Sequence, residues 1–291
     1  MPQPDAHNAD RGPEPTPEPR VEQLGDGVYA WIQPHGDDGF ANAGVIVDDD
    51  GITVIDTLMV RSQWEVFARS VARLGAPVRR VLLTHAHIDQ VGGTKAFKNA
   101  AVYGSQQTSD LLDQPMNFEA YKTFMPRFAD EFDDLAGVGT RTVTHVIDAP
   151  ARISARAEVL PAPGHTAGDL MVLVEDSDVC FAGDLCSFGV TPLGFQGDPA
   201  TWADVLDVVA ELAETIVPGH GHVGGAQDVA DLRAYLRVCV EANGDPSAIP
   251  PGPWDSWRER RHDAINVERA ALLAHGDDQI PPSMLRAIGL A

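Results

Sequence analysis

The stretch that decides the fold is Thr84-His85-Ala86-His87-Ile88-Asp89-Gln90-Val91-Gly92-Gly93. His85 and His87 are two positions apart, so their imidazoles point to the same side of an extended segment. Asp89 adds a charged oxygen ligand two positions later. Imidazole and carboxylate donors together suit zinc, iron or manganese. The closing glycines allow a tight turn into a following helix, and the stretch predicts a metal site at the end of a strand.

Taken alone, this stretch is also compatible with a polar loop, but three later segments repeat its design. Each follows a β-like run and combines glycine with one side chain that can bind a metal. They are Pro163-Gly164-His165-Thr166, Phe181-Ala182-Gly183-Asp184 and Pro218-Gly219-His220-Gly221. His165, Asp184 and His220 are therefore predicted to join the same centre.

The hydrophobic pattern predicts strands that alternate with helices, which indicates sheets covered by helices. Predicted strands are Val28–Gln33, Ala43–Val47, Ile52–Asp56, Val81–Leu83, Thr142–Ile147, Ala157–Leu160, Leu170–Val174, Val179–Ala182 and Thr215–Val217. Predicted helical regions are 60–74, 105–135, 200–213, 225–241 and 254–273. Asp49-Asp50-Gly51 is expected to form a hairpin turn.

Over roughly residues 24–241 the ordered motifs resemble the metallo-β-lactamase superfamily. The resemblance implies an α/β fold, an αββα sandwich of two mixed sheets, with the site at one edge. It implies that His85, His87 and His165 form a first metal site. By the same resemblance Asp89, Asp184 and His220 form a second site, with Asp184 bridging the two.

Gln90 departs from the family motif, which normally reads His-x-His-x-Asp-His. A glutamine carbonyl is a neutral and weak oxygen donor, so we expect a weakened second site. The interpretation is one or two zinc ions, with iron or manganese as alternatives. Gln90 could instead hydrogen-bond the attacking water or the substrate.

The ligand set indicates a hydrolase in which a metal-activated hydroxide attacks an acyl bond of a lactone, ester, thioester or amide. Asp89 is the candidate for proton transfer. One alternative is a mononuclear iron oxidoreductase, similar to the persulfide dioxygenases of this fold. The other is a degenerate member that only binds a ligand.

Other residues carry weaker signals. His222 could replace the absent ligand or hydrogen-bond another one. His35 lies in a loop expected near the pocket mouth, where it could contact the substrate or be exposed to solvent. The apolar stripe from Phe118 to Phe128 is expected to be core or pocket wall. Trp254 and Trp257 could cover the pocket or form a homodimer contact.

The chain is expected to have a disordered proline-rich tail at residues 1–20, a metallo-β-lactamase-fold domain at 21–245 and a packed helical extension at 246–291.

The net charge of the chain is −22, from 21 basic and 43 acidic residues. This charge disfavours nucleic acid and anionic membranes as partners and leaves a small molecule as the expected partner. No signal peptide or transmembrane run is visible, and three cysteines form no disulfide pattern, so a cytoplasmic location is predicted.

Overall fold

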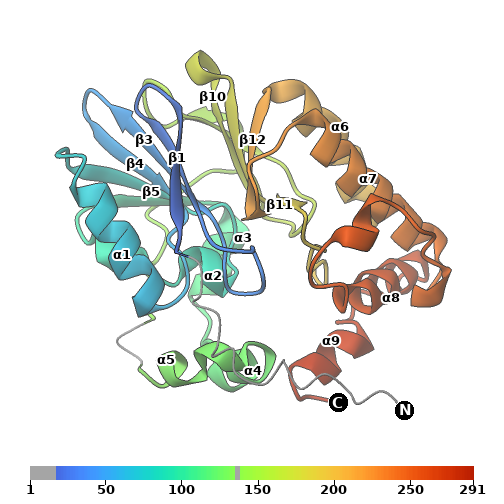
Figure 1. Ribbon diagram of the computed structural model, residues 1–291. Helices are drawn as coiled ribbons and strands as arrows, with labels where there is room; N and C mark the ends of the chain where they lie inside the picture. The colour runs from blue at the N-terminus through green and yellow to red at the C-terminus, as the bar shows by residue number, and fades with distance from the viewer. Residues whose placement is uncertain (1–17, 135–137) are drawn as a thin grey trace, which may run out of the picture.

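Two β-sheets packed face to face lie at the centre of the structure, with helices on their outer sides (Figure 1). The structure is a computed structural model and describes residues 18–134 and 138–291. Of the predicted tail, residues 1–17 lie outside the described residues, and the first strand begins at Arg20.

Within the described ranges the first sheet has seven strands, arranged in the order of the chain. They are β1 (Arg20–Gly25), β2 (Val28–Ile32), β3 (Ala43–Asp48), β4 (Gly51–Ile55), β5 (Val78–Leu82), β6 (Ala101–Gly104) and β7 (His145–Val146). Pairing is antiparallel from β1 to β4 and parallel from β4 to β7. Asp48 pairs with Gly51, which confirms the predicted hairpin.

The second sheet has five strands in the described part of the chain, in the order β12-β11-β10-β9-β8. They are β8 (Ala151–Arg152), β9 (Glu158–Pro161), β10 (Leu170–Val174), β11 (Val179–Phe188) and β12 (Thr215–Gly221). Only β11 and β12 run parallel. Each sheet is therefore built from one continuous part of the sequence.

The core has an apolar layer on each side of each sheet. Val28, Ile46 and Leu82 of the first sheet pack against Val172 and Phe181 of the second. On the outer face of the first sheet lies α1 (Arg61–Ala72), and on that of the second lie α6 (Pro199–Leu212) and α7 (Ala226–Glu241). This arrangement confirms the αββα sandwich.

The region predicted as helical from 105 to 135 is divided into shorter helices. They are α3 (Gln106–Leu112), α4 (Phe118–Phe124) and α5 (Ala129–Asp133). Pro115 lacks an amide hydrogen and disfavours helical backbone before it, which separates α3 from α4. Asn117 then caps α4 by accepting a hydrogen bond from Ala120 N at 3.1 Å.

The C-terminal region contributes α8 (His262–Ala274) and α9 (Pro282–Ala287), which follow an irregular segment. Trp254 and Trp257 pack on Tyr235 of α7, with ring centroids 5.9 and 5.4 Å away. Neither tryptophan lines the cavity described below. Met284 of α9 packs in one apolar cluster with residues of α4, among them Phe124.

Ion pairs also connect this region to the loop after β2. Arg258 pairs with Asp37, and Arg261 and His262 pair with Asp38. Burial alone would raise the pKa of Asp38, but the hydrogen bond and charge of His262, with the charge of Arg261, hold it below its usual value of 3.8.

The proposed boundary at residue 245, between the domain and the C-terminal extension, stays a prediction. None of the described helices has the length and apolar character needed to cross a membrane.

Candidate metal centre

His85 and His87 follow the end of β5, and Asp89 lies in the short helix α2 (Ile88–Val91). The carboxylate of Asp56 fixes this segment by accepting hydrogen bonds from Thr84 N and Thr84 Oγ1, both at 2.8 Å. Thr84 Oγ1 in turn accepts a hydrogen bond from His85 Nδ1 at 3.1 Å. His85 therefore presents Nε2 as its ligand atom, because Nδ1 carries the proton.

His87 is held by a residue that the sequence did not reveal. Its Nε2 donates to Gln196 Oε1 at 2.8 Å, which leaves Nδ1 as the ligand atom. The Phe195 ring stacks on the imidazole at a centroid distance of 5.3 Å. The segment around Gln196 has no hydrophobic period and no metal-type residue, so no sequence signal pointed to it.

His165 lies in the loop between β9 and β10, and Asp169 shapes that loop. The Asp169 carboxylate accepts hydrogen bonds from the Gly164 and Thr166 amides and from the Thr166 hydroxyl. Burial raises the pKa of Asp169 to about 7, although these hydrogen bonds act in the opposite direction. Trp202 of α6 packs edge-on against the His165 ring, at 5.4 Å between centroids.

Asp184 lies in β11 and His220 in the neighbouring strand β12. Gly219 allows the two to approach, because a Cβ at this position would overlap Asp184 Oδ1. His220 Nδ1 donates to the Gly36 carbonyl at 3.0 Å, so that Nε2 faces the carboxylates. Gly219, which belongs to one of the strand-end motifs, thus permits the close approach of two predicted ligands.

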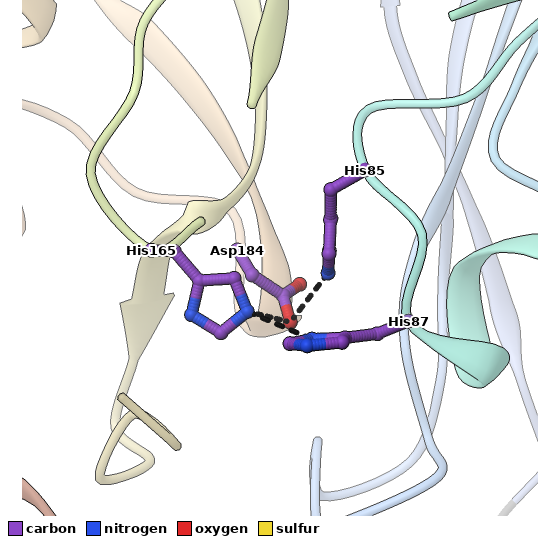
Figure 2. A group of neighbouring side chains, drawn as sticks. All are labelled: His85, His87, His165 and Asp184. Atoms are coloured by element: carbon purple, nitrogen blue, oxygen red, sulfur yellow. Dashed lines mark hydrogen bonds and ion pairs between the residues drawn. The ribbon is translucent and has the colours of Figure 1, made fainter. Parts of the chain in front are cut away.

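The predicted first site gathers at the edge between the two sheets (Figure 2). Ligand atoms of His85, His87, His165 and Asp184 all lie within 4.8 Å of one another. His165 Nε2 is 2.9 Å from His87 Nδ1, and Asp184 Oδ2 is 3.5 and 3.6 Å from the Nε2 atoms of His165 and His85. Four ligands about 2.0–2.1 Å from a tetrahedral zinc ion would be about 3.3 Å apart.

Two further observations fit a metal ion. His85 Nε2 is buried and has no hydrogen-bond partner in the described part of the chain. Burial lowers the pKa of His85 to about 4 and that of His165 well below its usual value. Both imidazoles are therefore neutral near pH 7, as metal ligands must be.

The predicted second group lies directly beside the first. His220 Nε2 is 3.3 Å from Asp89 Oδ2 and 3.6 Å from Asp184 Oδ2. Asp184 Oδ2 thus lies within 3.6 Å of an Nε2 atom of each of His85, His165 and His220. That position matches the bridging role that the family resemblance implied.

Gln90 is fully buried and bonds a predicted ligand. Its Nε2 donates to Asp184 Oδ1 at 2.7 Å, whereas its Oε1 has no hydrogen-bond partner among the described residues. Its backbone carbonyl accepts hydrogen bonds from the amide and hydroxyl of Thr57, which fixes the residue. The amide therefore acts on the carboxylate that both predicted sites share.

The structure does not bring His35 or His222 to this group. His35 is exposed and does not line the cavity at the centre. Gly221 has a φ of 92°, and after this turn His222 is exposed and pairs with Asp228 at 3.0 Å. Cys186 is fully buried in the apolar layer under α6 and α7, as expected for a small core residue.

The ligand group opens into a cavity of about 450 Å³. His87, Asp89, His165, Asp184 and His220 line it at the metal centre. The remaining walls are largely apolar and come mainly from α3, α4, the segment 190–196 and the C-terminal residues 280–290. Gly36, Asp38 and Gly39 of the loop after β2 and His262 of α8 also contribute to them. The apolar stripe of α4 is both core and wall, because Phe124 and Met125 belong to a buried cluster and also line the cavity.

The sequence model of the Metallo-beta-lactamase superfamily matches residues 36–220. The chain is 25% identical to a hydroxyacylglutathione hydrolase of Shewanella denitrificans over 229 residues, covering 78% of this chain and 71% of that one. It is 30% identical to a metallo-beta-lactamase type 2 of Elizabethkingia meningoseptica over 115 residues, covering 38% of this chain and 46% of that one.

Among solved structures, the fold is similar to that of the metallo-beta-lactamase FIM-1 from Pseudomonas aeruginosa in its mono-zinc form. The TM-score is 0.58 at 21% identity, covering 81% of this chain and 99% of that one. At this identity the likeness concerns the fold alone.

Proposed function

Since the chain belongs to the metallo-beta-lactamase superfamily, we propose that it hydrolyses an acyl bond of a small molecule at a zinc centre. The family and its hydrolase relatives support the coarser statement that it is a metal-dependent hydrolase. The bond type, the zinc ion and the small-molecule substrate are parts of the proposal. The observation that carries it is the convergence of three histidines and Asp184 on one point at the cavity wall.

The ligands define what this centre can hold. His85, His87 and His165 would bind one divalent ion with three neutral nitrogens, and Asp184 would contribute a charged oxygen. Asp89 and His220 would bind a second ion on the other side of Asp184. When bound, zinc lowers the pKa of water to about 7 and polarises a carbonyl oxygen.

The protein's own residues then have separate tasks. Asp89 lines the cavity and, in this proposal, takes a proton from the attacking water and passes it to the leaving group. The water oxygen bonds to the acyl carbon, and the bond from that carbon to the leaving group breaks. The Gln196 hydrogen bond to His87 and the Gln90 hydrogen bond to Asp184 keep the ligands oriented. The apolar walls limit access of bulk water to the reacting atoms.

The location of the protein is part of the same proposal. Cys180, Cys186 and Cys239 are free and buried, which supports the predicted reducing, cytoplasmic setting. A homodimer stays a proposal too.

The test joins metal analysis with turnover. We expect purified protein to contain zinc and to cleave at least one of a simple lactone, ester, thioester or amide. His165→Ala should lose metal and activity together, because it removes one of three nitrogen ligands. Bound iron with oxygen uptake on a persulfide would instead favour the mononuclear oxidoreductase. A His165→Ala variant with full metal content and turnover would contradict the site assignment.

A further inference from the structure

We infer that the substrate carries an uncharged, flexible apolar chain, which binds between α4 and the C-terminal segment. This inference rests on the proposed function and adds the substrate class to it. Three observations carry it: the charge of the cavity walls, their apolar surface and the charge of the whole chain.

Away from the metal centre, the described cavity walls offer no lysine or arginine to an anionic substrate. Among the lining residues, Asp38, Asp89 and Asp184 are carboxylates. Arg261 lies close by but outside this lining, where it pairs with Asp38 and Glu259 and covers the Phe124 ring. Asp38 is therefore already neutralised, and a cationic substrate finds no free partner in it.

An anionic group at the end of the substrate far from the metal centre would lie unpaired between these walls. Burial of a charge without a partner is strongly unfavourable. The net charge of −22 adds long-range repulsion, which lowers the local concentration of anions.

The apolar walls fit a hydrocarbon chain. Tyr121, Phe124 and Met125 face the cavity from α4 and the residue after it, and Met284, Ile288 and Leu290 face it from the C-terminal region. A volume of about 450 Å³ lies within the usual range for small-molecule sites. Each methylene buried there should raise binding about fourfold.

A buried, neutral hydroxyl in the wall suits an uncharged head group. Thr191 lines the cavity, is 1% exposed, and its Oγ1 has no hydrogen-bond partner in the described structure. A hydroxyl can donate to the carbonyl of an ester or amide without any charge on the ligand.

The experiment compares three p-nitrophenyl esters on the metal-loaded protein: butyrate, octanoate and the equally long 7-carboxyheptanoate. We expect kcat/KM to rise about a hundredfold from butyrate to octanoate, within the limit of about 250-fold for four buried methylenes. The carboxylate-ended ester should fall about a hundredfold below octanoate. Equal rates on all three esters, or a preference for 7-carboxyheptanoate, would overturn the inference while leaving the hydrolase proposal intact.

Binding of unreactive amides separates the inference from the proposed function. Calorimetry should show octanamide binding much more tightly than 7-carboxyheptanamide. If that difference appears and no ester is cleaved, the substrate-binding inference stands and the hydrolase proposal fails. If the two amides bind equally, or neither binds, the inference fails.

A charge introduced at the cavity mouth provides a second test with a matched control. Leu111 lines the cavity and is 40% exposed, so Leu111→Arg should fold normally. It should raise the rate on 7-carboxyheptanoate relative to octanoate about threefold to fivefold, as expected for one exposed ion pair. Val66→Arg on α1, also 40% exposed and away from the cavity, should leave the ratio unchanged. An unchanged ratio in Leu111→Arg would contradict the assigned binding mode.

Discussion

Replacement of Gln90 by methionine tests whether this side chain supports the metal centre. Methionine has a similar length, fills the same buried space and cannot donate to Asp184. The change removes the 2.7 Å hydrogen bond from Nε2 to Asp184 Oδ1. Loss of Oε1 should cost nothing, because this atom has no partner among the described residues. The backbone hydrogen bonds of residue 90 to Thr57 are retained.

The size of the effect follows from that single contact. A hydrogen bond to a charged group contributes about 1.5–3 kcal/mol. Loss of a hydrogen-bond partner of a metal ligand typically lowers metal affinity about 10–100-fold. We therefore expect Gln90→Met to weaken the tightest-bound ion about 10–100-fold, or about 1.4–2.8 kcal/mol.

The assay is a competition titration with a chromophoric chelator, which reports the dissociation constant directly. Gln227→Met is the matched control, because exposed Gln227 makes a similar amide-to-carboxylate hydrogen bond, 2.8 Å long, to Asp231 on α7. This control should keep wild-type metal affinity. Wild-type affinity in Gln90→Met as well would refute the role assigned to the amide.

Three further predictions concern the second ion, the C-terminal ion pairs and the tail. Gln90→His should tighten uptake of a second ion, measured by the same titration, and equal affinity would mean that residue 90 is not at a ligand position. Asp38→Asn should destabilise the fold at pH 6, and this penalty should shrink as the pH falls below 3.8. The lowered pKa of Asp38 contributes stability that is fully present above its unfolded value and is lost as the pH falls through its folded value. A denaturation penalty independent of pH would contradict this. Deletion of residues 1–17 should leave the melting temperature and metal content unchanged, and a large loss of either would show that the tail contributes to the fold.

The structure brings together the side chains that the sequence motifs singled out, and they could be singled out because each motif is local. A histidine or aspartate beside glycine at the end of a strand can be recognised within four residues, and the fold brings strand ends together. Leu170–Val174 was likewise predicted with its observed bounds, because five consecutive apolar residues form a buried strand. The short strand Ala101–Gly104 was missed, since four residues are too few to show a hydrophobic period.

The cavity could not be predicted, because its walls depend on packing between distant segments. Tyr121 and Met284 line the same space from opposite parts of the chain, and neither sequence segment indicates the other. Val179–Ala182 was predicted as a strand that stops before Asp184. In the structure β11 continues to Phe188, since its pairing with β12 extends along the chain beyond the ligand.

A chain without a disulfide acquires a covalent-like constraint at its metal centre. His87 and His165, which face each other, are 78 positions apart in the sequence and come from different sheets. In polymer terms, an ion bound by both closes a loop of that length. A cross-link that closes a loop of about 100 residues reduces the conformational entropy of the unfolded chain. In the entropic description this stabilises the folded state by about 4.7 kcal/mol. We therefore expect the bound ion also to act as a cross-link between the two sheets. Chelators in a purification buffer would then lower the melting temperature of the protein as well as its turnover.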